Sequence, residues 1–168
     1  PRMMKNAGVD RLSLLLCDEN KGALVSDQYI GVKRGDEELI SGPQGLYESI
    51  SGECYDTGKP VLVSDCSEPN IIPREYIRSL NLKSCIAVPV KLNSRPLGVL
   101  RFDNTSGYGT FTEDDIEFFS TLADQLGIVI GNARLFMERQ QAETAIRESE
   151  ERFRRLFEDL GDAVFVTE

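Results

Sequence analysis

The sequence contains no histidine and no tryptophan among its 168 residues. Without histidine, this segment cannot hold a Ser-His-Asp triad, a two-histidine zinc helix, a histidine-ligated haem or a phospho-accepting histidine. Its four cysteines, Cys17, Cys54, Cys66 and Cys85, form no C-x-x-C pair and have no histidine to complete a zinc set. Any enzymatic chemistry in this segment must therefore use cysteine or carboxylate groups.

Long apolar runs and clustered positive charge are scarce as well. The longest uninterrupted apolar runs are short, such as Leu126–Ile130, whereas a bilayer crossing needs about 20 mostly apolar residues. A net charge of −9 and a pI near 4.7 argue against nucleic acid as a partner, because phosphate binding requires clustered lysine and arginine. Pro1–Asp10 has no pattern typical of a secretory signal, and with the unpaired cysteines this predicts a reduced, cytoplasmic setting without a membrane span.

Apolar runs between polar turns predict an antiparallel sheet of five or six strands. Leu12–Cys17 is expected to be a buried strand, with Ala23–Val32 as its hairpin partner. Val61–Ser64 predicts a third, short strand. Cys85–Leu92 and Leu97–Phe102 predict a second hairpin, joined by the polar connection Asn93–Pro96.

Two short helices are expected between these strands. Four-residue spacing of Leu46, Ile50 and Cys54 predicts a helix over Leu46–Tyr55, after a loop at Gly35–Pro43 and before a break at Thr57–Pro60. After a loop at Asp65–Ile72, Pro73 suits a first helical position and predicts a second helix that extends to about Leu82.

A long helix is predicted from Thr112 to about Asp159. Asp115 follows three residues after Thr112, and we expect the Thr112 side-chain oxygen to cap free amides at this N-terminus. Between Ile116 and Met137 apolar residues occur nearly all round the helix, which indicates contacts with the sheet and with a second surface. The stripe of small residues Ala123, Gly127 and Gly131 fits close packing on the sheet or, less readily, a partner contact.

Beyond Glu138 the apolar residues thin to a seam with alternating spacings of three and four. Such spacing is typical of a coiled coil, and it predicts a parallel two-stranded coiled coil and therefore a homodimer. With its extension toward the N-terminus, the seam consists of Ile128, Leu135, Ala142, Ile146, Ser149, Phe153 and Leu156.

Several phrases of the sequence resemble those of GAF domains, which are small-molecule sensing and dimerisation modules of signalling proteins. The matching phrases lie within Gly52–Asp65, Ser84–Val90 and Pro96–Asn104, followed by F-T-E-D-D. The resemblance implies an α+β fold, an α/β sandwich with a central antiparallel sheet of about six strands, helices on both faces and a long C-terminal helix. It also implies a GAF domain over residues 1–137, whose first long helix would precede Pro1, and a signalling helix over 138–160.

The end of the sequence resembles the start of a different sensor domain. Ser149–Glu158 and Asp162–Glu168 are similar to the first helix and first strand of a PAS domain, which implies that 161–168 begin such a domain. One strand alone cannot bury its side chains, so we expect Asp162–Glu168 to be frayed or loosely docked. The order of GAF, helix and PAS resembles bacterial sensor histidine kinases and cyclic-di-nucleotide enzymes, and implies PAS and output domains further along the chain.

By the same resemblance, the ligand is an unidentified small molecule bound between the sheet and its covering helices. The expected pocket residues are Ser13, Asp65, Ile72, Tyr76 and Cys85. The cyclic-nucleotide motif of the family keeps Asn104, Phe111 and Asp115 here but lacks its lysine and glutamate, so Asp115 is better explained as a helix cap. Haem and bilin are not expected, because both need the missing histidine.

The cysteines leave an enzymatic alternative open. Free methionine sulfoxide reductases share the GAF fold and use a cysteine nucleophile with resolving cysteines, which makes Cys54 and Cys66 redox candidates, with Cys85 also near the expected pocket. Cys66 is expected on a loop, where the acidic Asp65 and Glu68 would raise its pKa. Otherwise the cysteines are small buried apolar residues. Three functions thus stand side by side: a non-enzymatic ligand sensor, which we favour, a cysteine enzyme, and a purely structural dimerisation unit.

Overall fold

The computed structural model describes residues 8–18, 20–31, 49–68 and 72–164, and the side chains of these residues except 158–164. Contacts between residues divide the chain into two compact units, Pro1–Ile128 and Val129–Glu168. The predicted loop Gly35–Pro43, the predicted helix start at Leu46, Val32 and residues 165–168 lie outside the described residues. The elements are β1 (Arg11–Asp18), β2 (Ala23–Ile30), α3 (Ile50–Thr57), β3 (Val61–Val63), α4 (Arg74–Ser79), β4 (Ser84–Leu92), β5 (Arg95–Asn104) and α5 (Glu113–Val164).

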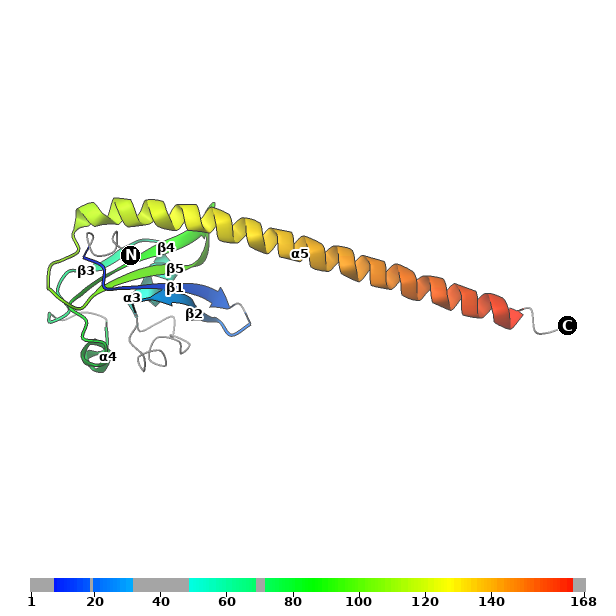
Figure 1. Ribbon diagram of the computed structural model, residues 1–168, viewed down its shortest axis with the longest axis horizontal. Coiled ribbons are helices and arrows are strands. Elements are labelled where there is room, and N and C mark those ends of the chain that lie inside the picture. Colours follow the sequence, from blue (N-terminus) through cyan, green and yellow to red (C-terminus); the bar gives the residue numbers. More distant parts are fainter. Residues whose placement is uncertain (1–7, 19, 32–48, 69–71, 165–168) are drawn as a thin grey trace. The chain divides into compact units, whose positions relative to one another are not determined.

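The centre of the first unit is an antiparallel sheet with the strand order β2-β1-β5-β4-β3 (Figure 1). Every neighbouring pair is antiparallel, and the described residues provide five strands, where about six were expected. Figure 1 shows α3 and α4 on one side of the sheet and the beginning of α5 on the other. The predicted α+β class, with helices on both faces and a long C-terminal helix, is therefore confirmed.

Each face of the sheet has its own core. On the α3 and α4 side, Leu15, Cys54 and Val99 belong to one cluster of buried side chains. On the α5 side, the ring of Phe102 on β5 stacks on Phe119 with 3.9 Å between centroids, and Phe111 meets Phe119 edge to face. Because successive strand residues point to opposite faces, Phe102 faces α5 while its neighbours in sequence face α3 and α4.

The β4–β5 hairpin is tighter than predicted. Leu92 pairs with Arg95, so only Asn93 and Ser94 form the turn, and β5 begins at Arg95 rather than at Leu97. Asn93 has a φ of 55°, a left-handed conformation that asparagine tolerates better than most residues. The polar connection was therefore located correctly, but part of it continues the strand.

The short helices differ from their predicted bounds at residues that set local geometry. The Ser49 hydroxyl accepts a hydrogen bond from the Gly52 N–H at 3.1 Å, which fixes the start of α3 at Ile50. Gly58, with a φ of 62°, ends α3 after Thr57 instead of after Tyr55. Helix α4 ends at Ser79, earlier than predicted, because Asn81 adopts a left-handed φ of 50°.

At the start of α5, Asp115 acts as a helix cap, as predicted, but the Thr112 hydroxyl donates a hydrogen bond instead of accepting one from a free amide. The Asp115 carboxylate accepts hydrogen bonds from the Thr112 N–H at 2.8 Å and from the Thr112 hydroxyl at 3.0 Å. Thr112 thus donates, and the acidic side chain three residues later organises the turn. The carboxylate also lies near the positive end of the helix dipole, which is a favourable position for it.

Two small residues of α5 pack closely on the sheet in the first unit. Ala123 is fully buried, and a Cβ on Gly127 would lie 1.9 Å from the Lys91 carbonyl oxygen. Only glycine fits a helix that approaches a strand so closely. The close contact of Ala123 and Gly127 with the sheet supports packing on the sheet as the reason for these two small residues. Gly131, the third residue of the stripe, belongs to the second unit, so this contact does not explain it.

Helix α5 continues to Val164, beyond the predicted end near Asp159. Asp162–Val164 are therefore helical, and the strand expected from Asp162 does not begin there. In the second unit, all described side chains from Leu135 to Phe157 are exposed. Among the described residues, no helix combines the length and the apolar character that a membrane span requires.

Candidate functional site

Three charged side chains lie buried on the face of the sheet that α3 and α4 cover. Arg11 on β1 and Arg101 and Asp103 on β5 are 5%, 4% and 3% exposed, respectively. Arg11 lies directly opposite Asp103, and Asp103 lies opposite Cys85 of β4 on its other side. Residues that face each other across antiparallel strands share one face, so these side chains meet in one row. We call Arg11, Arg101 and Asp103 the polar centre.

The carboxylate of Asp103 holds the polar centre together. It accepts hydrogen bonds from Nε and Nη2 of Arg101 at 2.8 Å and 3.3 Å, and its Oδ2 lies 3.6 Å from Nε of Arg11. Nη2 of Arg11 donates to the Leu80 carbonyl at the end of α4, at 2.7 Å. Two guanidinium groups share one carboxylate, so the polar centre has an excess of one positive charge.

Tyr76 of α4 covers Arg101. Nη1 of Arg101 donates to the Tyr76 hydroxyl at 3.3 Å, and the guanidinium carbon lies 5.3 Å from the centre of the ring. Burial acts to lower the pKa of Arg101, but the carboxylate of Asp103, together with Tyr76 and Cys85, outweighs burial and raises the pKa of Arg101 above its ordinary value. Arg101 therefore stays protonated, with a cation–π contact on one side and an ion pair on the other.

Two thiols lie beside the polar centre. Sγ of Cys66 is 3.9 Å from Sγ of Cys85, and both side chains are fully buried. The S–H···S contact lowers the pKa of Cys66, because it stabilises the Cys66 thiolate, and the same contact together with burial raises the pKa of Cys85. This corrects two expectations for Cys66: it is not exposed, and the effect of Cys85 exceeds that of the acidic Asp65.

The other two cysteines differ from this pair. Cys54 of α3 is fully buried in the apolar core, and burial raises its pKa to about 12. A thiol with so high a pKa is a poor nucleophile at neutral pH. Cys17 near the end of β1 is half-buried. Of the two redox candidates from the sequence, Cys66 therefore lies beside a second thiol, and Cys54 is a core residue.

The structure brings four of the five predicted pocket residues to this side of the sheet. Ser13 lies opposite Arg101 on the neighbouring strand, Tyr76 bonds Arg101, and Ile72 and Cys85 belong to the same buried cluster as Cys66. Asp65 is separate: its carboxylate accepts hydrogen bonds from the backbone and hydroxyl of Ser67, at 2.7 Å and 2.6 Å. Hydrogen bonds from Ser67 hold the pKa of Asp65 below its ordinary value.

None of the three charged residues of the polar centre was predicted as a site residue from the sequence. A usable signal lay in the run Arg101-Phe102-Asp103, where charged residues alternate with an apolar one inside a strand that helices cover on both faces. Such alternation places both charges on one inward face, and buried charges need partners there.

Two residues retained from the cyclic-nucleotide motif, Asn104 and Phe111, have structural roles like that of Asp115. The Asn104 amide donates to the Gly8 carbonyl, and its side-chain oxygen accepts from the N–H groups of Ser106 and Gly107 at 2.8 Å and 2.7 Å. Phe111 is a core residue against Phe119. These contacts give Asn104 and Phe111 structural roles that require no bound nucleotide.

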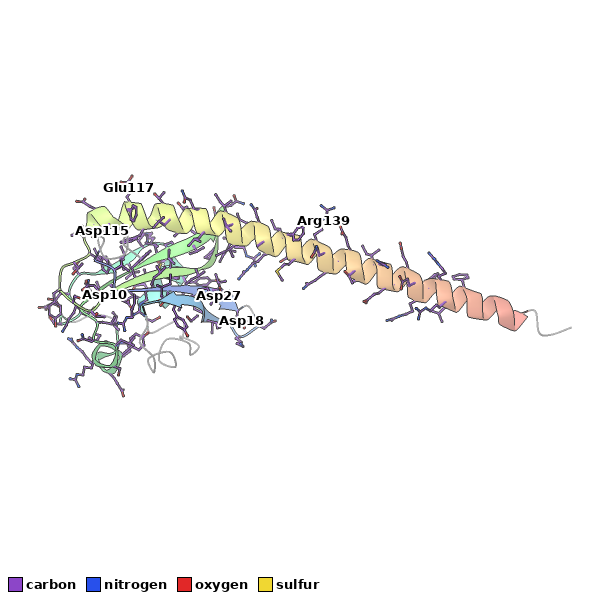
Figure 2. The ribbon with its side chains drawn as sticks, in the orientation of Figure 1. Asp10, Asp18, Asp27, Asp115, Glu117 and Arg139 are labelled. Atoms are coloured by element: carbon purple, nitrogen blue, oxygen red, sulfur yellow. The ribbon has the colours of Figure 1, made fainter. Side chains whose placement is uncertain are left out.

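Asp10, labelled in Figure 2, fastens the segment before β1 to the loop after β5. Its carboxylate accepts hydrogen bonds from the Thr105 N–H and hydroxyl and from the Ser106 hydroxyl, at 2.8 to 2.9 Å. Partial burial acts to raise the pKa of Asp10, but these hydrogen bonds together outweigh it and lower the pKa. Beside Asp10 a cavity of about 110 Å³ reaches Arg11 and is lined by Asp10, Arg11, Gly31, Ser79, Leu80, Asn81 and Thr105.

In the part of the chain that the structure describes, no set of side chains could hold a metal ion. No group of three or more histidine, cysteine, aspartate or glutamate side chains gathers there at ligand distance. The described site instead offers guanidinium groups, a phenol and two thiols. These groups can bind an anionic or hydrogen-bonding molecule, or exchange electrons as thiol and disulfide.

Comparison with known proteins identifies the family. The GAF domain model matches residues 2–130. The chain is 31% identical over 139 residues, 78% of its length, to a methyl sulfide methyltransferase-associated sensor of Methanosarcina acetivorans. The chain spans 13% of the length of that sensor, and 2% of another curated relative that it matches.

Solved structures share the fold. The GAF domain of an Acinetobacter phosphoenolpyruvate-protein phosphotransferase matches with a TM-score of 0.66 and 24% identity, covering 80% of this chain and 78% of that one. A free methionine-R-sulfoxide reductase from Neisseria meningitidis matches with a TM-score of 0.65 and 22% identity, covering 79% of this chain and 74% of that one. With the family model covering more than half of the sequence, the chain belongs to the GAF domain family.

Proposed function

We propose that this chain is the sensory GAF module of a cytoplasmic signal-transduction protein, that it binds a small molecule next to the polar centre, and that it has no catalytic activity of its own. A sensory role is supported by the family and by the similar methanogen sensor. The observation that carries the proposal is the buried cluster of two arginines and one aspartate under α4. Apolar residues of similar size would often be as stable, so a buried charge cluster suggests a functional reason for its presence.

The signal would leave the domain along α5. Five large apolar seam residues are more than half exposed in the single chain: Ile128, Leu135, Ile146, Phe153 and Leu156, at 53% to 63%. Ala142 and Ser149 of the same seam are exposed too. A second copy of the helix would cover this seam, and burial of each large side chain would contribute about 1.5–3 kcal/mol.

The charged residues around the seam fit an exposed helix with one apolar contact stripe. Arg139 bonds Glu143 at 2.8 Å and Arg147 lies 3.3 Å from Glu151, both four residues apart along α5. Figure 2 shows Arg139 on the part of α5 that belongs to the second unit. Such pairs contribute only about 0.3–0.5 kcal/mol each, so they support the helix while the apolar stripe would drive pairing.

In this proposal a ligand acts through a difference in affinity. A molecule that binds one arrangement of the paired helices more tightly than another shifts the population toward the tightly bound arrangement. The size of this shift is set by the difference between the two affinities. The helices would lead into a PAS domain and then into a kinase or cyclase output in the same protein. The ligand itself is unidentified.

Native mass spectrometry of the purified chain tests the proposal, because it reports subunit number and retained small molecules together. We expect a dimer that carries an added small-molecule mass, and loss of that added mass in the variant Arg101→Met. Lys59→Gln removes an exposed cation elsewhere on the domain and serves as control. A dimer that neither retains nor binds any small molecule would favour the purely structural unit, and a bare monomer would contradict the proposal.

The Cys66–Cys85 pair favours one second candidate, a thiol-dependent reductase for methionine sulfoxide. The oxygen would pass from the sulfoxide to the Cys66 sulfur, which releases methionine and leaves a sulfenic acid. Cys85 would then attack that sulfur and water would leave, so two thiols become one disulfide while one sulfoxide is reduced. A sulfur separation of 3.9 Å is short enough for this with a small side-chain movement.

Turnover of free methionine sulfoxide with dithiothreitol as reductant tests the second candidate. Activity that disappears in Cys66→Ser and Cys85→Ser but survives in Cys17→Ser would support the enzyme. Absence of turnover in the unaltered chain would exclude the reductase and favour the sensory module.

A further inference from the structure

A surface groove with an unusual charge lies outside the polar centre. The groove has a volume of about 490 Å³ and runs between the segment after β3, α4, the start of β4 and the loop before α5. Its lining residues are Cys66, Ser67, Arg74, Ile77, Arg78, Asn81, Leu82, Lys83 and Tyr108. Every one of these residues belongs to the described part of the chain.

The charge of the groove is opposite to that of the chain. Arg74, Arg78 and Lys83 line it, and no carboxylate is among the lining residues that the structure describes, although the whole chain has a net charge of −9. The nearby Asp65 already accepts two hydrogen bonds from Ser67. Three converging cations on an acidic protein concentrate anions locally, since a concave surface focuses the field of its charges.

Counting partners in the described part of the chain, the three cations have hydrogen-bond donors to spare. Arg74 is fixed by donating from Nη1 to the carbonyl oxygens of Ser67 at 2.7 Å and Cys66 at 3.3 Å, which leaves its other nitrogens available. Nζ of Lys83 donates to the Tyr108 hydroxyl at 3.0 Å and lies 4.8 Å from the ring centre, so the ammonium is positioned with donors to spare. Within the described residues, the Arg78 side chain makes no hydrogen bond or ion pair, and Arg78 lies one helical turn from Arg74.

We infer that this groove binds a phosphate-bearing small molecule through Arg74, Arg78 and Lys83. A guanidinium group matches phosphate oxygens with two parallel N–H donors, and a lysine adds a point charge. Three cations suit a group that carries more than one negative charge. Tyr108, which is 52% exposed, supplies an apolar surface beside the phosphate for the rest of the molecule. The groove reaches Cys66 beside the polar centre, but it contains none of the three charged residues Arg11, Arg101 and Asp103. The inference rests on its own cations and does not require a ligand at the polar centre.

Calorimetric titration of the whole chain with inorganic pyrophosphate tests the inference. We expect saturable binding that weakens as salt rises, and about tenfold weaker binding for Arg78→Gln, because a charged hydrogen bond is lost. Lys59→Gln also removes one surface cation but does not line the groove, and it should bind like the unaltered chain. Equal weakening in both variants, or no binding by the unaltered chain, would overturn the inference.

Two further ligands separate phosphate recognition from general anion binding. Citrate has a similar charge without phosphorus, and citrate binding as tight as pyrophosphate binding would overturn selectivity for phosphate. ATP adds an aromatic ring, and we expect the unaltered chain to bind ATP more tightly than pyrophosphate. In Tyr108→Ala, which also removes the partner of Lys83, we expect ATP and pyrophosphate to bind equally. Thermal unfolding of Arg78→Gln should match the unaltered chain, because the Arg78 side chain has no hydrogen bond or ion pair to lose among the described residues.

Discussion

Arg101 and Asp103 of β5 form two hydrogen bonds, 2.8 Å and 3.3 Å long, although both side chains are almost completely buried. Residues two apart on a strand point to the same face, so the backbone places this pair side by side before any packing occurs. Arg11 approaches the same carboxylate from β1 at 3.6 Å. One carboxylate therefore compensates two buried cations.

Asp103→Asn should destabilise the domain strongly. The substitution keeps the shape but leaves two guanidinium groups buried without a counter-charge, and loss of one partner of a buried ion pair costs about 3–5 kcal/mol. Urea unfolding at neutral pH measures the change. Glu117→Gln on the exposed surface of α5 is the matched control and should cost less than about 0.5 kcal/mol. An Asp103→Asn variant as stable as this control would contradict the role of the carboxylate.

The Cys66 and Cys85 thiols should form an internal disulfide on mild oxidation. With diamide, the intact mass is expected to fall by about 2 Da, the two hydrogens lost with the new bond, and dithiothreitol should restore it. Cys66→Ser or Cys85→Ser should abolish this change, whereas Cys54→Ser should not, since Cys54 is an isolated core thiol with a pKa of about 12. A disulfide that survives in Cys85→Ser would show that another pair reacts.

Asp10→Asn should lower stability in a pH-dependent way. The folded state lowers the pKa of Asp10 below its ordinary value of 3.8, so the ionised carboxylate stabilises the fold above that pH. This stabilisation is lost as pH falls through the folded pKa. We expect a loss of about 1 kcal/mol or less at pH 7, because the carboxylate is largely exposed.

Thermal unfolding of Asp10→Asn and the unaltered chain at several pH values measures this effect. The difference in Tm should be largest near neutral pH and should shrink in acid, below the pKa of the folded state. A constant difference across the whole range would show that the carboxylate charge plays no part.

Gly127→Ala should destabilise the first unit, although alanine favours a helix by about 1 kcal/mol over glycine. The added Cβ would lie 1.9 Å from the Lys91 carbonyl oxygen, a backbone atom that cannot move aside cheaply. Overpacking of this kind typically costs about 1–3 kcal/mol, so the clash should exceed the helix preference. Gln125→Ala, on the exposed side of the same helix, is the control and should be neutral in urea unfolding. A more stable Gly127→Ala variant would contradict the close approach of α5 to the sheet.

The fold was largely predictable because its signals are local. The apolar run Leu12–Cys17 marks a buried strand, and Asp115 marks the start of a long helix whatever the rest of the molecule does. The predicted bounds of the hairpin and the predicted end of α5 were less accurate. The turn at Asn93 and the helical conformation of Asp162–Val164 depend on contacts and geometry that a short stretch of sequence does not contain.

The site was harder to predict because burial is a property of the whole fold. Cys66 follows a strand in an irregular segment and was expected to be exposed, yet Ile72, Leu80 and Leu82 around it close the core. Arg11 and Asp103 are far apart in sequence, and only the β1–β5 register brings them together. Tyr76 and Cys85 were named as pocket candidates through resemblance to the family, not through their own pattern.

Sedimentation equilibrium of the purified chain tests the central claim most directly, that two copies pair along α5. We predict a particle of twice the chain mass of 18.8 kDa, and a shift toward the single-chain mass for the double variant Ile146→Glu and Phe153→Glu, which places charges in the seam. Glu148→Gln, outside the seam, should leave the dimer unchanged. An unaltered chain that sediments as an 18.8 kDa monomer at tens of micromolar would contradict the account.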